Sequence, residues 1–68
     1  MTPFRSVVYS RGMREHLLID GEPLTLCERV PEHINPGTVD ELPAENIVPG
    51  NYCPRCIQRA HEIRARER

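Results

Sequence analysis

The stretch Cys53-Pro54-Arg55-Cys56 decides the fold of this 68-residue sequence, because it places a C-x2-C pair at the start of the best predicted helix. Proline is favoured at the first helical position, where its missing N–H costs nothing. Both thiols would then lie at the positive N-terminus of the helix, which stabilises thiolates. At ~100° per residue, the side that should pack inward consists of Cys56, Ile57, Ala60, Ile63 and Arg64. We therefore predict a helix over residues 53–68.

A β-hairpin is predicted upstream, from apolar runs at residues 16–19 and 24–30 on either side of Asp20-Gly21-Glu22-Pro23. Two such runs around Asp-Gly are a hairpin signal. The proline of this segment has no N–H to give to a strand ladder, so all four intervening residues are placed in the loop. In the resulting register Leu18 faces Thr25.

The same register places His16 opposite Cys27. Directly opposed residues of an antiparallel pair project from one face of the sheet, with Cβ atoms ~4.5–5.5 Å apart. A shorter loop would shift the partner but keep the face, because side chains alternate with a period of two. One metal ion could then contact both side chains.

Four residues make up the candidate metal site, with the spacing H-x10-C-x25-C-x2-C: His16, Cys27, Cys53 and Cys56. A structural zinc ion takes four nitrogen or sulfur ligands in a tetrahedron. Three cysteines do not suit the even-numbered disulfide framework of a small secreted domain, whereas three thiolates and one imidazole complete a zinc site. We predict one structural zinc ion.

Other interpretations of the histidines and cysteines stay open. His61 and His33 compete for the fourth ligand position. His61 lies ~140° from Cys56 on a continuous helix and so points away from the site, and His33 is expected in a loop. The cysteines could instead be free buried thiols or a redox pair. A redox C-x2-C is typical beside a βαβ pattern, which is absent from this sequence.

The whole chain, residues 1–68, is expected to form a single zinc-binding domain of the α+β class. Hydrophobic residues make up 38% of it, and so small a hydrophobic core is rarely stable without a disulfide, a metal ion or a similar cross-link. Zinc binding should therefore contribute most of the folding free energy. The alternating residues 4–11 predict a third strand beside the hairpin. The acidic, proline-rich residues 31–50, with the turn signal Asn35-Pro36-Gly37, are interpreted as a long ordered loop.

The ligand pattern resembles a known group of proteins. A histidine that opens a hairpin, then Leu24-Thr25-Leu26-Cys27, then Cys53-Pro54-Arg55-Cys56 before an arginine-rich helix, is similar to the small zinc-ribbon proteins of actinobacteria and their phages. The resemblance covers residues 7–63 and implies a zinc-ribbon or treble-clef-like fold with one histidine and three cysteine ligands. Where that family commonly has glycine after the hairpin cysteine, this sequence has Glu28. Most such proteins have no assigned activity, so the resemblance indicates a zinc site without indicating a function.

No enzymatic activity is expected. Four protein ligands leave no open position on zinc, and the sequence contains no H-E-x-x-H or H-x-E motif. We expect a zinc-finger adaptor or regulator that binds a larger protein, such as host transcription machinery or another enzyme. No apolar run approaches the ~18 residues of a membrane span. Residues 1–5 lack the apolar region of a signal peptide, so a cytoplasmic location is expected.

Three helix arginines suggest an alternative function. Arg55, Arg59 and Arg66 lie on the side away from the apolar residues, and arginine pairs bidentately with phosphate. They are candidate contacts for a protein partner or for nucleic acid. The net charge of −1 and the lack of an aromatic residue on this helix argue against strong nucleic-acid binding. A solvated helix face with a Glu62–Arg66 pair is the plainer interpretation, and a zinc-containing nucleic-acid-binding regulator is the alternative hypothesis.

Overall fold

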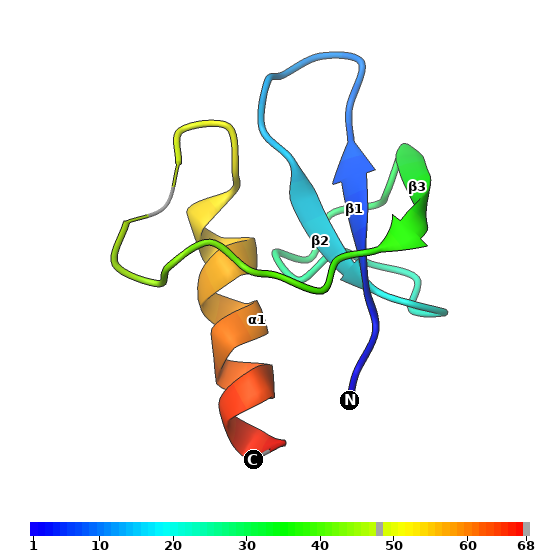
Figure 1. Ribbon diagram of the computed structural model, residues 1–68. Coiled ribbons are helices and arrows are strands. Elements are labelled where there is room, and N and C mark those ends of the chain that lie inside the picture. Colours follow the sequence, from blue (N-terminus) through cyan, green and yellow to red (C-terminus); the bar gives the residue numbers. More distant parts are fainter. Residues whose placement is uncertain (48, 68) are drawn as a thin grey trace.

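The computed structural model describes residues 1–47 and 49–67 of the chain. Four elements follow one another: β1 (Phe4–Val8), β2 (His16–Ile19), β3 (His33–Thr38) and α1 (Pro54–Arg66) (Figure 1). The strands form one antiparallel sheet in the order β2-β1-β3. The predicted α+β class is therefore confirmed, with three strands and one helix near the C-terminus.

The strand predicted at residues 4–11 is the centre of the sheet, although it ends at Val8. Phe4 pairs with Ile19 and Val7 pairs with His16, so β1 runs the full length of β2. Phe4 and Val7 are fully buried. A central strand needs partners on both edges, and the second partner comes from a segment for which the sequence predicted no strand.

That second partner is β3, and it corrects the interpretation of residues 31–50 as a loop. Residues His33–Thr38 pair with β1 in an irregular register, because Ser6 alone stands against three residues of β3 at Asn35-Pro36-Gly37. The predicted turn signal is thus a bulge within a strand. Bulges are places where a strand tolerates proline, since the ladder is already interrupted there.

One arginine of β1 stabilises this bulge from across the sheet. The guanidinium of Arg5 donates to the carbonyl oxygens of Asn35 and Pro36, and its Nε donates to Asp20 Oδ1 at 2.6 Å. Asn35 Nδ2 donates to the hydroxyl of Ser6 at 3.0 Å. These side-chain bonds satisfy polar groups that a regular ladder would otherwise have paired.

The predicted second strand of the hairpin, residues 24–30, is wrong as a strand but right in its register. Leu18 and Thr25 form an isolated antiparallel bridge, as expected. Beyond it the chain turns back on itself: the N–H of Glu28 donates to Thr25 O at 2.8 Å, and that of Thr25 donates to Arg29 O at 2.9 Å. Cys27 therefore lies in a tight turn and not on a strand.

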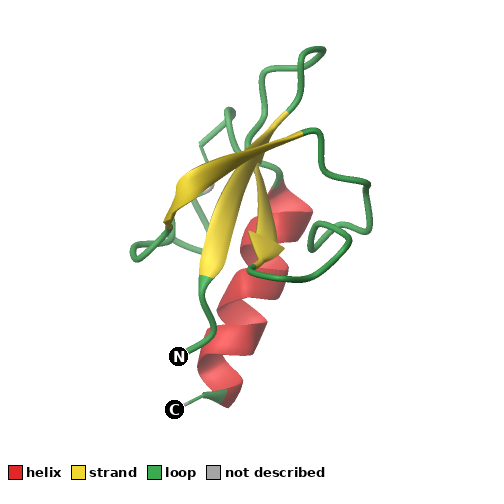
Figure 2. Cartoon of the chain, turned by 90° about the vertical axis from the view of Figure 1, so that its right-hand side faces the viewer, coloured by secondary structure: helices red, strands yellow, loops and turns green. Residues whose placement is uncertain are grey.

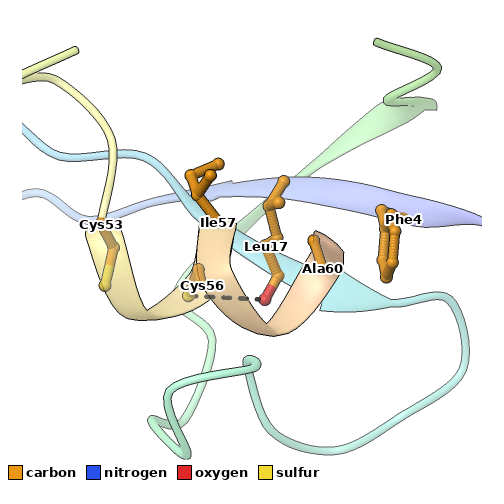
Figure 3. Packing of buried hydrophobic residues seen from close by; sticks show 6 residues of the cluster. All are labelled: Phe4, Leu17, Cys53, Cys56, Ile57 and Ala60. Carbon is orange, nitrogen blue, oxygen red and sulfur yellow. Dashed lines mark hydrogen bonds between the residues drawn. The ribbon is translucent and has the colours of Figure 1, made fainter. Parts of the chain in front are cut away.

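Helix α1 packs on one face of the sheet and buries its apolar side there (Figure 2). It spans Pro54–Arg66, within the predicted 53–68, with Cys53 as the N-cap residue and proline at its start as predicted. The core joins the helix to β1 and β2 through buried side chains, among them Phe4, Leu17, Cys56, Ile57 and Ala60 (Figure 3). Two cysteines of the candidate metal site thus belong to the core itself.

The two ends of the described chain meet beside the last turn of α1 (Figures 1 and 2). The N–H of Thr2 donates to Glu67 Oε2 at 2.7 Å, and Arg64 Nη1 donates to Thr2 O at 2.6 Å. The Arg64 guanidinium also lies 4.4 Å from the centre of the Phe4 ring, a cation–π contact. These contacts hold the residues before β1 against the helix.

Candidate metal centre

The four side chains predicted as zinc ligands converge on one point. Their candidate ligand atoms all lie within 4.8 Å of one another. His16 Nδ1 is 3.2 Å from Cys27 Sγ and 3.7 Å from Cys56 Sγ. The three cysteines are free thiols, so none is used in a disulfide. His16, Cys53 and Cys56 are buried, and Cys27 is half-buried.

Backbone hydrogen bonds bring the start of β2 and the start of α1 together at this point. The N–H of Cys53 donates to Glu15 O at 2.9 Å, and the N–H of Glu15 donates to Asn51 O at 2.6 Å. His16 follows Glu15 as the first residue of β2, while Cys53 and Cys56 occupy the N-cap and the first turn of α1. The helix start is therefore fixed against the residue next to the histidine ligand.

The turn that carries Cys27 has two features that the sequence did not reveal. Thr25 is almost fully buried, and its hydroxyl lies 3.2 Å from Cys27 Sγ while accepting the N–H of Arg29 at 3.0 Å. Glu28 has a positive φ of 67°, a left-handed conformation that favours glycine. The turn therefore needs a glycine-like backbone directly after Cys27.

The geometry fits a zinc ion. With Zn–S bonds of about 2.3 Å and a Zn–N bond of about 2.0–2.1 Å, a tetrahedral ion requires N···S separations of about 3.6 Å. The two separations from His16 Nδ1, 3.2 and 3.7 Å, lie on either side of this value. One nitrogen and three sulfur atoms are also the donor set that structural zinc prefers. The group is therefore consistent with a single structural zinc ion and with a zinc-stabilised domain.

The surroundings of the two helix cysteines shift their pKa values in opposite directions. Burial raises the pKa of Cys56 to about 12, and the neighbouring Cys27 and Cys53 sulfurs add to the increase. Burial also raises the pKa of Cys53. Hydrogen bonds from the backbone N–H groups of Cys56 and Arg55 and from the other thiols outweigh it, so the pKa of Cys53 is lowered. A divalent cation would favour the thiolate at both positions.

His16 is held in a neutral, oriented state. Burial lowers its pKa, and the charges of Arg29 and Arg14 lower it further, so the ring is uncharged at neutral pH. Tyr9 packs against it edge to face, with ring centroids 5.0 Å apart. The Arg29 guanidinium lies 4.8 Å from the centre of the Tyr9 ring. Neutral imidazole is the form that binds a metal.

Neither rival histidine lies with the cysteines. His61 points away from them, as its helical position predicted, and its Nε2 is 2.6 Å from Pro43 O. The His61 side chain is half-buried. His33 begins β3, is exposed, and lies 3.4 Å from the carboxylate of Glu32. It therefore belongs to a strand and not to the predicted loop.

The three candidate contact arginines of the helix are exposed but do not act alike. Arg59 Nη1 lies 3.3 Å from Glu62 Oε2 and forms an ion pair with it. The sequence pattern predicts that Glu62 pairs with Arg66 instead. Arg55 lines a cavity beside the metal site. Arg66 lies in the last turn of α1, far along the helix from Arg55.

Comparison of the chain with family models, with curated proteins and with solved structures finds no match. The resemblance to actinobacterial and phage zinc-ribbon proteins therefore stays a prediction. Functional inference for this chain rests on its own residues and their geometry.

Proposed function

We propose that this chain is a non-enzymatic zinc-finger adaptor, in which one zinc ion organises a small fold that binds a larger protein. The observation that carries the proposal is the closed ligand set of His16, Cys27, Cys53 and Cys56. Structural zinc sites have four protein ligands, whereas catalytic sites keep one position for water or substrate. Three of the ligands are buried, and two of them, Cys53 and Cys56, belong to the hydrophobic core, so the site fits a structural role better than a catalytic one.

The surface supports binding to a protein. Several large apolar side chains are exposed, among them Met13 at 93%, Val30 at 74% and Ile47 at 73%. Scattered apolar residues are common on any protein surface, but a chain with so small a hydrophobic core has few large apolar side chains that it can leave exposed. No described helix is both long and apolar enough to cross a membrane. The partner class that we propose is a larger protein, such as host transcription machinery or another enzyme.

Reconstitution from purified components tests this function. Zinc-loaded protein is used to isolate a partner from nuclease-treated cell extract at moderate salt, the partner is identified, and the complex is rebuilt from the two pure proteins. Cys53→Ala, which removes a zinc ligand, is the matched control and should fail to form the complex. A complex that forms equally well with Cys53→Ala would contradict a role for the zinc-organised fold.

The same zinc-loaded protein can be used to test the alternative function, in which the chain binds nucleic acid. Binding to DNA or RNA should weaken steeply with salt if phosphates are neutralised by arginine. If that salt dependence were present and were flattened by changing Arg55, Arg59 and Arg66 to glutamine, the chain would be a nucleic-acid-binding regulator. A reconstituted complex with one purified protein, without tight binding to DNA or RNA, supports the adaptor.

A further inference from the structure

Four arginines surround a cavity of about 500 Å³ that opens beside the metal site. They come from three separate parts of the chain: Arg11 and Arg14 from the loop between β1 and β2, Arg29 from the end of the Cys27 turn, and Arg55 from the first turn of α1. That loop and the start of α1 lie at the same end of the molecule (Figure 1). No acidic residue of the described chain lines this cavity.

The four arginines of the cavity differ from most other arginines of the described chain in that they form no ion pair with an acidic side chain. Arg5, Arg59 and Arg64 each form an ion pair with an acidic side chain. Within residues 1–47 and 49–67, five arginines form no such pair: Arg11, Arg14, Arg29, Arg55 and Arg66. Four of these five line the one cavity, and all four are exposed. The positive charge here is thus free to meet an external anion.

The metal site does not neutralise this charge. His16, Cys27 and Cys53 form part of the cavity lining, so a zinc ion held by these residues would border the cavity. Zinc with three thiolates carries a net charge of −1, which leaves three of the four arginine charges uncompensated. A single ion is also far smaller than the cavity, so room remains for a ligand.

We propose that this cavity, named here the arginine pocket and lined by Arg11, Arg14, Arg29 and Arg55, binds a short acidic peptide segment of the adaptor's partner. Planar guanidinium groups match carboxylates bidentately, which gives both strength and orientation. The source of the acidic segment rests on the proposed adaptor function. The anion-binding property rests only on the pocket.

Two observations favour an acidic peptide over nucleic acid. The chain as a whole carries −1, so the residues outside these four arginines carry −5, which repels an extended polyanion but not a short segment held in the pocket. The aromatic residue of the pocket, Tyr9, already contacts Arg29 with its face and packs against His16. It is therefore not free to stack on a base, which is the usual contact to single strands.

Binding of a labelled hexaglutamate peptide to the zinc-loaded protein tests the pocket, with fluorescence anisotropy as the readout. Arg14→Gln combined with Arg55→Gln should weaken binding about tenfold or more, since two charge-assisted contacts are lost. Arg66→Gln is the matched control for a single charge, because Arg66 is also exposed and unpaired among the described residues but lies outside the pocket. It should change affinity less than about twofold.

A second double variant, Arg11→Gln with Arg14→Gln, leaves the C-x2-C segment unchanged and should also weaken binding about tenfold. Zinc stoichiometry by native mass spectrometry confirms that each variant keeps its metal. The inference would be overturned if no peptide binding were seen up to about 1 mM. It would also be overturned if Arg66→Gln weakened binding as much as each pocket substitution does. Tighter binding of a labelled oligothymidylate of equal charge, lost in the pocket variants, would be the third contradicting result. Failure of the adaptor function would appear separately, as peptide binding without a protein partner.

Discussion

The ring of Tyr9 meets the ring of His16 edge to face, at 90° and with centroids 5.0 Å apart. The hydroxyl of Tyr9 donates to Val30 O at 2.9 Å, so the ring is fixed at its far end as well. A metal-binding histidine needs an outer partner that holds its ring in one orientation. Tyr9 supplies that constraint by packing, and it links the loop after β1 to the chain that follows the Cys27 turn.

Removal of the Tyr9 ring should therefore weaken zinc binding without removing a ligand. We expect Tyr9→Ala to lower zinc affinity about tenfold, as for other outer partners of metal ligands. Tyr9→Phe keeps the ring and loses one hydrogen bond, at a cost of about 1 kcal/mol of stability. Competition with a chromogenic chelator measures the zinc affinity of both variants. Equal affinities of the alanine and phenylalanine variants would show that the ring does not orient His16.

Loss of a cysteine ligand should unfold the domain. Cys53→Ala and Cys27→Ala are each expected to abolish the cooperative thermal transition in the presence of zinc, because so thin a core depends on the metal. His61→Ala is the control: it removes a hydrogen bond to Pro43 O, costs about 1 kcal/mol, and leaves the zinc in place. Circular dichroism with temperature measures the transition. A Cys53→Ala protein that melts cooperatively would contradict the predicted ligand set.

Zinc affinity should increase with pH. A cysteine thiol in the unfolded, zinc-free chain has a pKa of about 8.5 and is mostly protonated at neutral pH. In the folded chain, burial and the neighbouring sulfurs raise the pKa of Cys56 further, to about 12. Its proton must leave on binding, and each proton released gives about a tenfold gain in affinity per pH unit. His16 adds no proton at neutral pH, since burial lowers its pKa.

Calorimetry at one pH in two buffers of different ionisation enthalpy counts these protons. The heats should differ in proportion to the number released, and His61→Ala should release the same number. An affinity that does not change with pH would mean that Cys56 is not a zinc ligand.

Replacement of Glu28, the left-handed residue in the Cys27 turn, by glycine should increase the stability of the protein. Glu28→Gly is expected to stabilise the zinc-bound protein by about 0.5–1 kcal/mol, because relief of about 1–2 kcal/mol of left-handed strain exceeds the extra flexibility that glycine gives the unfolded chain. Glu28→Ala keeps the strain and should give no gain. Denaturant unfolding of both variants at saturating zinc measures the difference, and stabilisation by alanine as large as by glycine would refute this explanation.

Local rules were sufficient for the helix and for most of the metal site. Proline after Cys53 set the helix start, and the placement of residues 20–23 in a four-residue loop paired Leu18 with Thr25. That register brought the segment of Cys27 near His16, even though the chain turns where a strand was expected. The turn itself depends on a left-handed Glu28, and no rule assigns that conformation to glutamate in advance.

The sequence could not reveal β3 because its stability comes from distant residues. Pro36 and Gly37 are typical of turns, and the bulged strand is stabilised there by Arg5 and Ser6, which lie some thirty residues earlier in the chain. The arginine pocket was missed for the same reason. Arg11, Arg14 and Arg29 are scattered in the sequence. The helix pattern drew attention to Arg55, Arg59 and Arg66, of which Arg55 alone lines the pocket.

The hydrogen bond between Thr2 and Glu67 has a consequence for how this fold can be combined with others. A folded unit in which the entering and leaving segments touch, as they do at Thr2 and Glu67, can be inserted into a surface loop of a host protein, since the host chain leaves and returns at almost the same point. The reverse is also open: a short peptide across this contact would close the backbone into a ring, from which new termini could be cut elsewhere. The metal ligands would keep their places in either arrangement, so the zinc-binding unit is portable.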